Sequence, residues 1–403
     1  MATPSRSKTN VPAYLALLND PDATRRITAA DMLGRSRDPR AVPSLSAALS
    51  DPDEYVRQEA ARALRYIGHS SALPFLIERL GAEPDPSVKV FIIEAIGSTG
   101  DGTAAQPLLA ALSDPDTSIR IAASDALASN RIAPHADVPT MIAALSDPSA
   151  QVRSHIAVAL GHSGDVRAVD PLISALSDSS VLVRANAITA LGALGDQRAS
   201  PHLISASRDP NHTIRISAAS ALGRLRDPSA IPHLIIMLRD QTETVRGAAA
   251  SALGMMRSSA VTSPLLDSLR QASPYVQSMA LRALGQNGDR NAVPGILTFL
   301  RSQIEATSQT PGSDLNPALQ AISALGNLHD DRAVPLLTEI AEGQSGVLRD
   351  SAREALSLIQ GRSGSMTIPT EQHSILGMIP QRTDQIQVTR PSEQRQPRRR
   401  AVV

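Results

Sequence analysis

Apolar and polar residues alternate along this chain with a helical period, in short runs that come in pairs. From Ala41 to Gly68 (AVPSLSAALSDPDEYVRQEAARALRYIG), Leu, Val and Ala recur every three or four residues in two runs, with Ser-Asp-Pro between them. The same plan returns from Ala168 to Asp196. Such spacing predicts two short amphipathic helices in each stretch, each with one apolar face.

The helix pair is the unit of an internal repeat. A proline opens each unit, and successive prolines stand 30 to 33 residues apart until the last step, which is 41. Two short helices cannot bury their apolar faces alone, so neighbouring pairs must stack into a continuous core. The pattern therefore predicts an all-α solenoid of about eleven two-helix repeats. The opening prolines are Pro12, Pro43, Pro74, Pro107, Pro139, Pro171, Pro201, Pro232, Pro264, Pro294 and Pro335.

Each helix carries its own start and stop signals. Pro suits the first turn, where its missing N–H costs nothing, and Asp can cap the second helix. The second helix runs through V-R-x-x-A-x-x-A-L-G, whose Gly we expect to stop it in the left-handed conformation. The aligned alanines are expected where neighbouring repeats approach closely, so a bulky side chain there would overpack. These alanines are Ala63, Ala126, Ala159, Ala190, Ala221 and Ala252.

The repeat signature divides the chain into three parts. We expect residues 1–10 to be disordered, residues 11–360 to form the solenoid, and residues 361–403 to be a disordered tail rich in Arg, Gln and Pro. The long step before the last proline places an insertion at about residues 302–317, which we expect to be a disordered surface loop.

The repeat resembles HEAT repeats, and within that family the short bacterial type named after phycobilisome lyases. The resemblance rests on the eleven copies of the proline-opened helix pair and covers residues 11 to 360. It implies a right-handed superhelix of stacked pairs whose second helices line the concave face, the default binding surface. Such a fold does not by itself imply a function.

An acidic residue stands six positions before a basic one in each of the first eight repeats. Repeat nine has Gln271 and Gln277 instead, and repeat ten has Gly312 and Ala318. Residues lost together serve each other, so we interpret the pairs as structural. The resemblance implies a hydrogen-bonded ladder between adjacent repeats. Each charge-assisted bond of this kind contributes about 1.5 to 3 kcal/mol to stability. The pairs are Asp20 and Arg26, Asp51 and Arg57, Glu83 and Lys89, Asp114 and Arg120, Asp147 and Arg153, Asp178 and Arg184, Asp209 and Arg215, and Asp240 and Arg246.

A second periodic Asp follows the second helix in seven repeats. Asp is a common cap and turn residue, so we expect it to cap the start of the next helix pair. These residues are Asp38, Asp101, Asp165, Asp196, Asp227, Asp289 and Asp330.

Composition narrows the chemistry. The 39 basic residues balance 39 acidic ones, which disfavours a surface built to neutralise nucleic-acid phosphates. The absence of Cys excludes a disulfide framework, a thiolate metal site and a cysteine nucleophile. No window approaches the roughly 20 apolar residues of a membrane span, and the N-terminus has no signal-peptide core. We therefore expect a soluble, cytoplasmic protein.

Catalytic motifs are missing. The sequence has no Walker-type phosphate loop, no G-x-S-x-G elbow and no paired carboxylates outside the ladder. Deoxyhypusine hydroxylases share the repeat and bind iron through His-Glu dipeptides, which this sequence lacks; His155 and His162 come nearest to a ligand pair. Phycobilin lyases share the repeat as well. We expect no cofactor and no metal, and keep a hydroxylase-like enzyme or a lyase-like subunit as the alternative class.

The predicted binding surface lies two and five positions after the ladder Arg, on the second helices. Small neutral side chains occupy these positions in repeats four to eight, and larger ones gather toward both ends. Because interface hot spots favour aromatic residues and Arg, the ends are predicted to anchor a partner. For Phe91 and Met279, ordinary packing between repeats is the equal alternative. The predicted anchors are Arg62, Tyr66, Phe91, Met279 and Arg282.

The predicted function is a non-catalytic scaffold or adaptor that binds another protein along the concave face. Nucleic acid is not an expected partner except through the basic tail, which ends in an Arg-rich stretch from Arg395 to Arg400. The tail also holds an apolar patch from Ile375 to Ile379, a candidate docking segment.

Overall fold

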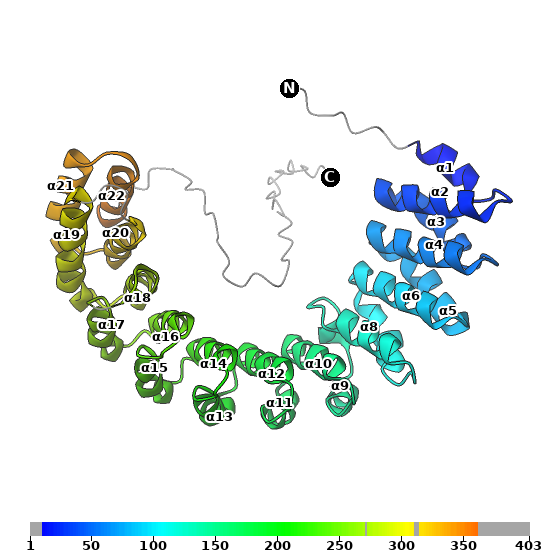
Figure 1. Ribbon diagram of the computed structural model, residues 1–403, viewed down its shortest axis with the longest axis horizontal. Helices are drawn as coiled ribbons and strands as arrows, with labels where there is room; N and C mark the ends of the chain where they lie inside the picture. The colour runs from blue at the N-terminus through cyan, green and yellow to red at the C-terminus, as the bar shows by residue number, and fades with distance from the viewer. Residues whose placement is uncertain (1–9, 271, 310–313, 362–403) are drawn as a thin grey trace, which may run out of the picture. The chain divides into compact units, whose positions relative to one another are not determined.

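The computed structural model describes residues 10–270, 272–309 and 314–361. Within these ranges the regular structure consists of 22 α-helices and ten short 3-10 helices. The α-helices follow one another in eleven pairs that stack side by side (Figure 1). The predicted all-α repeat architecture is confirmed. The predictions for the tail, including 375–379 and 395–400, fall outside the described residues except at Gly361. Those for residues 1–10 do so except at Asn10.

The first helices are mostly short: eight of the eleven have seven residues, two have ten, and the one in repeat ten has 17. Each begins within one or two residues of the repeat proline, as the missing N–H of proline allows. The first helices are α1 (Val11–Leu17), α3 (Val42–Ala48), α5 (Leu73–Ala82), α7 (Ala105–Ala111), α9 (Val138–Ala144), α11 (Val169–Ala175), α13 (Ser200–Ala206), α15 (Ile231–Met237), α17 (Thr262–Ser268), α19 (Val293–Gln309) and α21 (Val334–Gly343).

Except in repeat ten, the second helix is the longer of the pair, and the second helices carry most of the packing. Each contacts its own first helix and the second helix of the next repeat, and they lie on the inner side of the curved row in Figure 1. They are α2 (Ala23–Ser36), α4 (Glu54–Ile67), α6 (Pro86–Thr99), α8 (Thr117–Leu127), α10 (Ala150–Ser163), α12 (Val181–Leu194), α14 (His212–Leu225), α16 (Glu243–Met255), α18 (Pro274–Asn287), α20 (Asn316–Leu328) and α22 (Gly346–Ile359).

A single turn of 3-10 helix precedes each first helix from α3 onward. The periodic Asp caps this turn in seven repeats, as Asp196 does by accepting the backbone N–H of Arg198 at 2.9 Å. The predicted capping role of all seven residues is confirmed. The turns are η1 (Pro39–Ala41), η2 (Ser70–Ala72), η3 (Gly102–Ala104), η4 (Ala133–His135), η5 (Val166–Ala168), η6 (Gln197–Ala199), η7 (Pro228–Ala230), η8 (Ser259–Val261), η9 (Arg290–Ala292) and η10 (Asp331–Ala333).

A contact between a glycine of one second helix and an alanine of the next sets the distance between these helices. A methyl group on Gly192 of α12 would lie 2.8 Å from the Cα atom of Ala221 in α14, closer than any real packing contact. Hydrogen at this position therefore lets the two backbones meet. The glycines of this kind are Gly34, Gly97, Gly161, Gly192, Gly223, Gly254, Gly285 and Gly326, opposite Ala63, Ala126, Ala190, Ala221, Ala252, Ala283, Ala324 and Ala355.

This packing corrects the role predicted for the Gly of the A-L-G pattern. Gly192 and Gly223 lie inside their helices, and the left-handed residue comes three positions later, at Gly195 with φ 74° and at Arg226 with φ 53°. The pattern contains two separate signals that adjoin in sequence. The first serves the contact between repeats, and the second ends the helix.

The insertion in repeat ten lengthens a helix. Helix α19 continues through residue 309, so residues 302–309, expected in a disordered loop, are helical. Gln, Ile, Glu and Ala in this stretch favour helix, and the Pro-Gly pair that ends the pattern lies further on, within residues 310–313, which are outside the described part.

Candidate functional site

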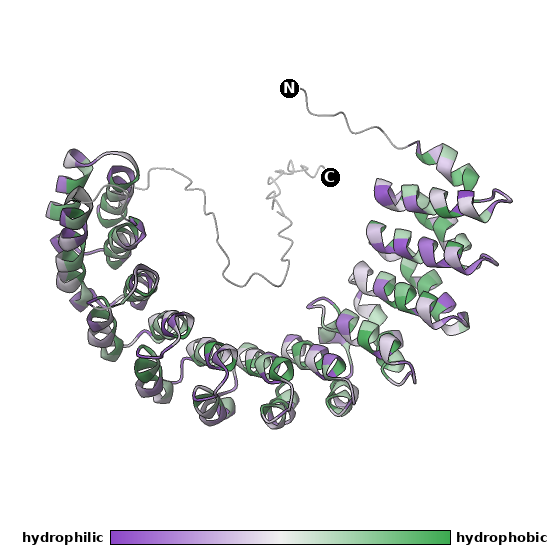
Figure 2. Cartoon of the chain, in the orientation of Figure 1, coloured by the Kyte–Doolittle hydropathy of each residue, from purple (hydrophilic) through white to green (hydrophobic). Residues whose placement is uncertain are grey.

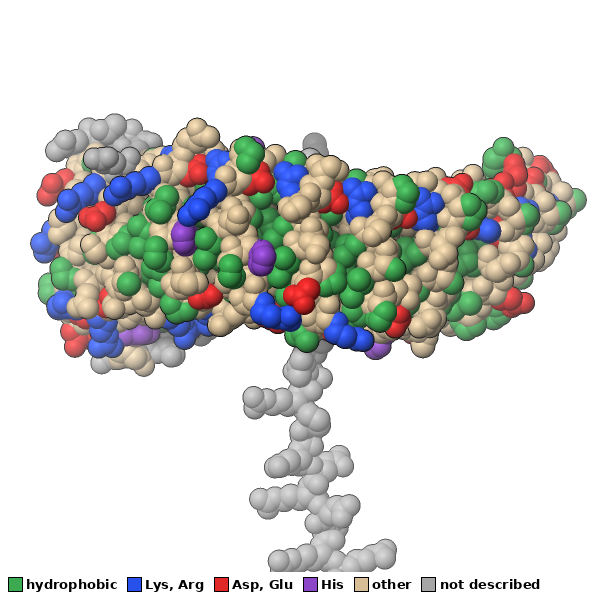
Figure 3. All heavy atoms as spheres, turned by 90° about the horizontal axis from the view of Figure 1, so that it is seen from below, with side chains coloured by type: hydrophobic (Ala, Val, Ile, Leu, Met, Phe, Trp, Pro, Cys, Tyr) green, Lys and Arg blue, Asp and Glu red, His purple; other side chains and the backbone are tan. Residues whose placement is uncertain are grey.

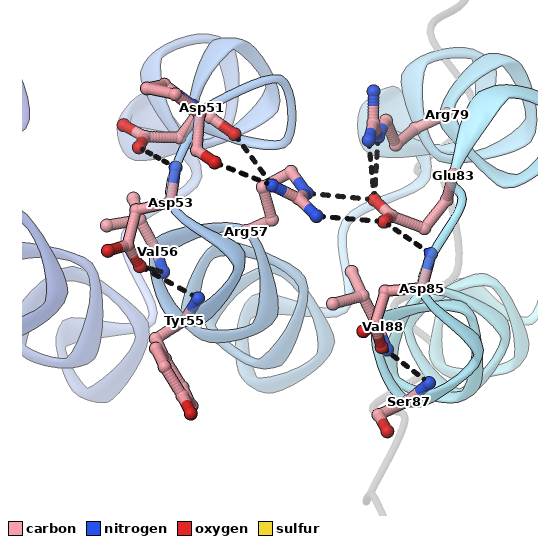
Figure 4. A network of polar contacts seen from close by, with 11 residues as sticks. Asp51, Asp53, Tyr55, Val56, Arg57, Arg79, Glu83, Asp85, Ser87 and Val88 are labelled. Atoms are coloured by element: carbon pink, nitrogen blue, oxygen red, sulfur yellow. Dashed lines mark hydrogen bonds and ion pairs between the residues drawn. The ribbon is translucent and has the colours of Figure 1, made fainter.

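A ladder of charged residues follows the turns that join first helices to second helices. In repeat two, Arg57 Nη1 donates to the carbonyl oxygens of Asp51 at 3.0 Å and Pro52 at 3.2 Å. Its Nε and Nη2 donate to the carboxylate of Glu83 in the next repeat at 3.0 and 3.1 Å (Figure 4). Each ladder Arg of this kind ties its own turn to the neighbouring one.

The ladder carboxylate that an Arg contacts therefore belongs to the following repeat. This corrects the predicted pairing of an acidic and a basic residue within one repeat. The Arg stands in the second helix, and the turn of its own repeat binds it through carbonyl groups rather than through the carboxylate. Close pairs, with N–O distances of 2.7 to 3.0 Å, are Arg26–Asp51, Arg57–Glu83, Arg120–Asp147, Arg153–Asp178 and Arg215–Asp240. Looser pairs are Lys89–Asp114 at 3.8 Å and Arg184–Asp209 at 3.7 Å.

Several ladder carboxylates are held in the ionised form by their partners. The Glu83 side chain is completely buried, which by itself raises its pKa, but hydrogen bonds from Arg57 and Arg79 outweigh burial and hold the pKa below its ordinary value. At Asp51 burial is likewise outweighed by Arg26, and the pKa is lowered. Groups held in the ionised state by fixed partners are poorly placed to exchange protons with a substrate, which favours a structural role.

The ladder changes after repeat eight. Arg246 Nη1 donates to the carbonyl oxygens of Asp240 at 2.8 Å and Gln241 at 3.2 Å, with no ion pair to any described carboxylate. In repeat nine Gln277 replaces the Arg, and its Nε2 donates to the carbonyl oxygen of Leu269 at 2.9 Å. The bond within the turn is thus kept where the bond between repeats is lost.

The inner face of the second helices is the second periodic feature. Counted from the ladder Arg, positions −2, +2, +5 and +9 recur at helical spacing and form what we call the inner row. In α4 these are Tyr55, Glu59, Arg62 and Tyr66, of which only Glu59 is buried. Sequence reasoning placed the +2 and +5 positions and missed Tyr55. Carrying the same spacing one turn further in each direction would have found it.

Aromatic side chains project from the N-terminal part of the inner row. Tyr55 and Tyr66 of α4 are 62% and 44% exposed. Phe91 of α6 is instead partly buried and packs against the core, which agrees with its alternative role in packing between repeats. The two tyrosines are therefore better placed than Phe91 to meet a partner.

Charged side chains link helices α2, α4 and α6. Arg62 of α4 pairs with Glu59 at 2.8 Å and with Asp31 of α2 at 3.7 Å, and Arg65 pairs with Glu94 of α6 at 2.6 Å. Burial raises the pKa of Glu59 above its ordinary value, against the opposing effect of Arg62. Figure 2 shows the resulting concentration of hydrophilic residues on α2 and α4.

A smaller group of large side chains occupies the inner row of α18. Arg282 is exposed, whereas Met279 is partly buried against the core and accepts a hydrogen bond from Ser251 Oγ to its sulfur at 3.7 Å. Tyr275, two turns before Arg282, lies over Gly247 of α16, where a methyl group would come within 2.6 Å of its ring. Burial, together with the nearby Glu243, raises the pKa of Tyr275 against the lowering effect of Arg282.

The predicted anchors thus form two separate groups. One lies on α4 and α6 and the other on α18, with five second helices between them. On α12, α14 and α16 the row consists mainly of small or neutral side chains, such as Thr189, Ser220 and Ser251. Leu182, at 54%, is an exposed apolar side chain there that was not predicted.

His155 and His162 do not form a ligand pair. His155 Nδ1 shares a hydrogen bond with Ser124 Oγ at 3.1 Å, and His162 Nδ1 with the carbonyl oxygen of Ala128 at 2.8 Å, so both tie α10 back to the preceding repeat. In the described part of the chain no three or more His, Cys, Asp or Glu residues gather to hold a metal. None of the described helices combines the length and apolar character needed to cross a membrane.

Comparison with known sequences identifies the repeat. A family model described as HEAT repeats matches residues 11–89, 73–137, 138–217, 200–272 and 262–357. These stretches together cover nearly all of the eleven helix pairs. No curated protein matches the sequence.

Solved structures show the same fold. Importin beta is similar with a TM-score of 0.59 and 15% identity, over 87% of this chain and 57% of its own. Kap95p, solved in its complex with RanGDP, gives 0.57 and 15%, over 88% and 56%. YibA of Escherichia coli gives 0.46 and 22%, over 62% of this chain and 92% of its own. At these identities the likeness to importin beta and Kap95p concerns the fold alone.

Proposed function

Because this chain belongs to the HEAT-repeat family, we propose that it is a non-catalytic scaffold or adaptor that binds another protein along its inner row. The observation that carries the proposal is the distribution of side chains on that row. Exposed tyrosines stand on α4 and the exposed Arg282 on α18. The inner row of the helices between them is mainly small or neutral, with Glu94, Asp125 and Arg224 as its charged members.

The α4 end has the chemistry of an interface hot spot. Tyr55 and Tyr66 offer large, rigid contact surfaces with a hydroxyl group at the tip. Arg62 is held by Glu59 and Asp31, so it loses little side-chain entropy when a partner binds. These ion pairs leave Arg62 39% exposed, which keeps part of the guanidinium available.

The middle of the inner row supports close approach. Side chains such as Ser217, Ser220 and Ala248 present little bulk, so a partner backbone can lie near the helices and find hydroxyl groups for hydrogen bonds. Arg282 at the far end provides a second charged contact. We infer that a partner long enough to reach both ends gains affinity from two anchors joined by a permissive centre.

We assign the repeat to the short bacterial subtype named after phycobilisome lyases, and hence infer a bacterial, cytoplasmic protein. The seven-residue first helices support this assignment. The assignment does not bring the lyase activity with it, since the described residues that carry the proposal are binding rather than reactive groups.

The test is affinity capture from the native cell lysate with the full-length chain, followed by mass spectrometry and measurement of Kd for the retained protein. We expect Tyr55→Ala with Tyr66→Ala to weaken binding about tenfold or more. The matched control is Phe75→Ala, which removes an aromatic ring that is 48% exposed on the first helix α5. This control should bind like the wild type.

Two results would contradict the proposal. If the Phe75 variant lost the partner and the tyrosine variant kept it, the binding surface would lie on the first helices. If the purified chain carried stoichiometric iron, or a pigment together with a partner chain, the hydroxylase-like or lyase-like class would be favoured instead. Phe91→Ala should mainly lower the free energy of unfolding, because the ring packs against the core.

A further inference from the structure

The turns that join first helices to second helices lie along one edge of the solenoid, which we call the ladder edge. This edge carries opposite charges at its two ends. Two positions after the ladder carboxylate, the residue that caps the second helix is Asp in repeats one to four and Ser, Asn or Thr in repeats five to nine. The position before the ladder carboxylate is neutral in the first six repeats and Arg in the next three, and Arg301, one further step of 31 residues along, lies within α19. We call Asp22, Asp53, Asp85 and Asp116 the acidic row, and Arg208, Arg239, Arg270 and Arg301 the basic row.

The acidic row is fixed in place but electrostatically open. The carboxylate of Asp53 accepts the backbone N–H groups of Tyr55 at 2.9 Å and Val56 at 3.2 Å, which holds it at the turn. None of the four carboxylates forms an ion pair with another described residue. Glu54 beside the row is exposed and adds to its charge, while Arg25 at the first turn opposes it.

The basic row is open as well. All four side chains are exposed, and within the described residues none pairs with a carboxylate; Arg208 Nη2 has a contact of 3.4 Å to His233 Nδ1. Arg246, the ladder Arg without a described carboxylate, adds a further positive charge, and Glu243 opposes it. In Figure 3, Lys and Arg side chains recur along most of the upper edge, and Asp and Glu side chains gather at its right end.

The two rows have the same pitch. Successive members stand 31 or 32 residues apart in the acidic row and 31 apart in the basic row, one for each helix pair. Four charges of one row can therefore face four of the other together. Within one copy the rows occupy different repeats of the same edge, so they meet only when two copies come together.

We propose that the ladder edge is a self-association surface, on which two copies of this chain join edge to edge about a two-fold axis. The axis lies between repeats five and six, so that repeat one faces repeat ten, two faces nine, three faces eight and four faces seven. Each acidic row then meets the basic row of the other copy, and the contact closes at two copies because it is isologous.

A second copy fits this edge better than a polyanion does. Nucleic acid or polyphosphate would use the basic row and be repelled by the acidic one, whereas a second copy satisfies both. The balance of 39 basic and 39 acidic residues in the chain agrees with a partner of the same composition. The inner row takes no part, so the dimer and the proposed scaffold function are independent.

The test is sedimentation velocity of the full chain over a range of concentrations at about 0.05 M and about 1 M NaCl, where the Debye length falls to about 3 Å. We expect a dimer at low salt that dissociates at high salt. Arg208→Glu, Arg239→Glu and Arg270→Glu together should weaken the dimer about tenfold or more. The control with the same charge change is Arg224→Glu, Arg282→Glu and Arg353→Glu, at exposed positions off the edge, and should leave it intact.

A charge swap separates lost pairing from misfolding. The complementary variant has Asp53→Asn, Asp85→Asn and Asp116→Asn, which keep an N-cap, with Glu54→Lys, Ser87→Lys and Ser118→Lys at exposed sites. Each variant alone should be monomeric, and an equimolar mixture should form a heterodimer. A wild-type chain that stays monomeric at low salt, or a dimer insensitive to the Arg variant, would overturn the proposal. A monomer that binds polyphosphate through the basic row would overturn it in favour of a polyanion site.

Discussion

Repeats one to eight are tied along one edge by the ladder of ion pairs, whereas repeats nine to eleven stack without any described ion pair between repeats on that edge. The glycine–alanine contact runs through both regions. A methyl group added to Gly192 would lie 2.8 Å from the Cα atom of Ala221 in the first region, and one added to Gly285 would lie 3.0 Å from that of Ala324 in the second. The comparison indicates that helix-to-helix packing sets the stack, and that the ladder adds stability and register to it.

The largest effect should come from filling the shared contact. We expect Gly192→Val and Gly285→Val each to lower the free energy of unfolding by about 3 kcal/mol, because a side chain there must displace the facing backbone. Urea unfolding followed by circular dichroism measures the change. Gly81→Val is the control, since nothing lies within 4 Å of its added methyl group. A much smaller loss at Gly285 than at Gly192 would show that the two regions do not share one packing mode.

Breaking the ladder should cost less. Arg57→Met removes the hydrogen bonds to Glu83, so that only Arg79 and one backbone N–H still bind this buried carboxylate. We expect this variant to lower the free energy of unfolding by about 2 kcal/mol. Arg246→Met, at the end of the ladder, loses only bonds to carbonyl groups and should cost about 1 kcal/mol. Equal losses in urea unfolding would contradict the importance of the bond between repeats. Adding Glu83→Gln to the Arg57 variant should recover part of the stability.

Acidification should affect the two regions unequally. The pKa values of Asp51, Glu83, Asp178 and Asp240 are lowered in the folded chain, so their stabilisation is present above the ordinary values of 3.8 and 4.5. It is lost as the pH falls through the lower folded values. Hydrogen exchange at decreasing pH should show α4 to α14 losing protection before α18. Arg332 is the main cause that lowers the pKa of Asp330 in repeat eleven to about 2. The Asp330–Arg332 pair should therefore be the last to lose its stabilising effect as the pH falls. Earlier loss at α18 would contradict the stabilising role of the ladder.

An effect as small as that of Arg246→Met is expected in the region without the ladder. Gln277→Ala removes the bond to the Leu269 carbonyl and should lower the free energy of unfolding by about 1 kcal/mol. Gln286→Ala, at an exposed inner-row position of the same helix, is the control and should be neutral. If both variants matched the wild type in thermal unfolding, the remaining bond within the turn would have no measurable value.

Part of the candidate site followed from sequence. The periodicity located Arg62, Tyr66 and Arg282 on one face of the second helices, because helical spacing is a local property. The periodicity did not separate these residues from Phe91 and Met279, which share the face but are partly buried and pack against the core. That difference depends on how the helices tilt and pack, which no single repeat determines.

The sequence by itself determined the number of repeats, the helix starts and the capping by Asp38 and its equivalents, since these depend on residues only a few positions apart. Only the tertiary structure decided that Arg57 binds Glu83, 26 residues away, and that Gly192 serves a contact rather than a helix end. The physical reason is that both features arise between repeats. A periodic sequence offers the same partners at every step, and the geometry of stacking selects among them.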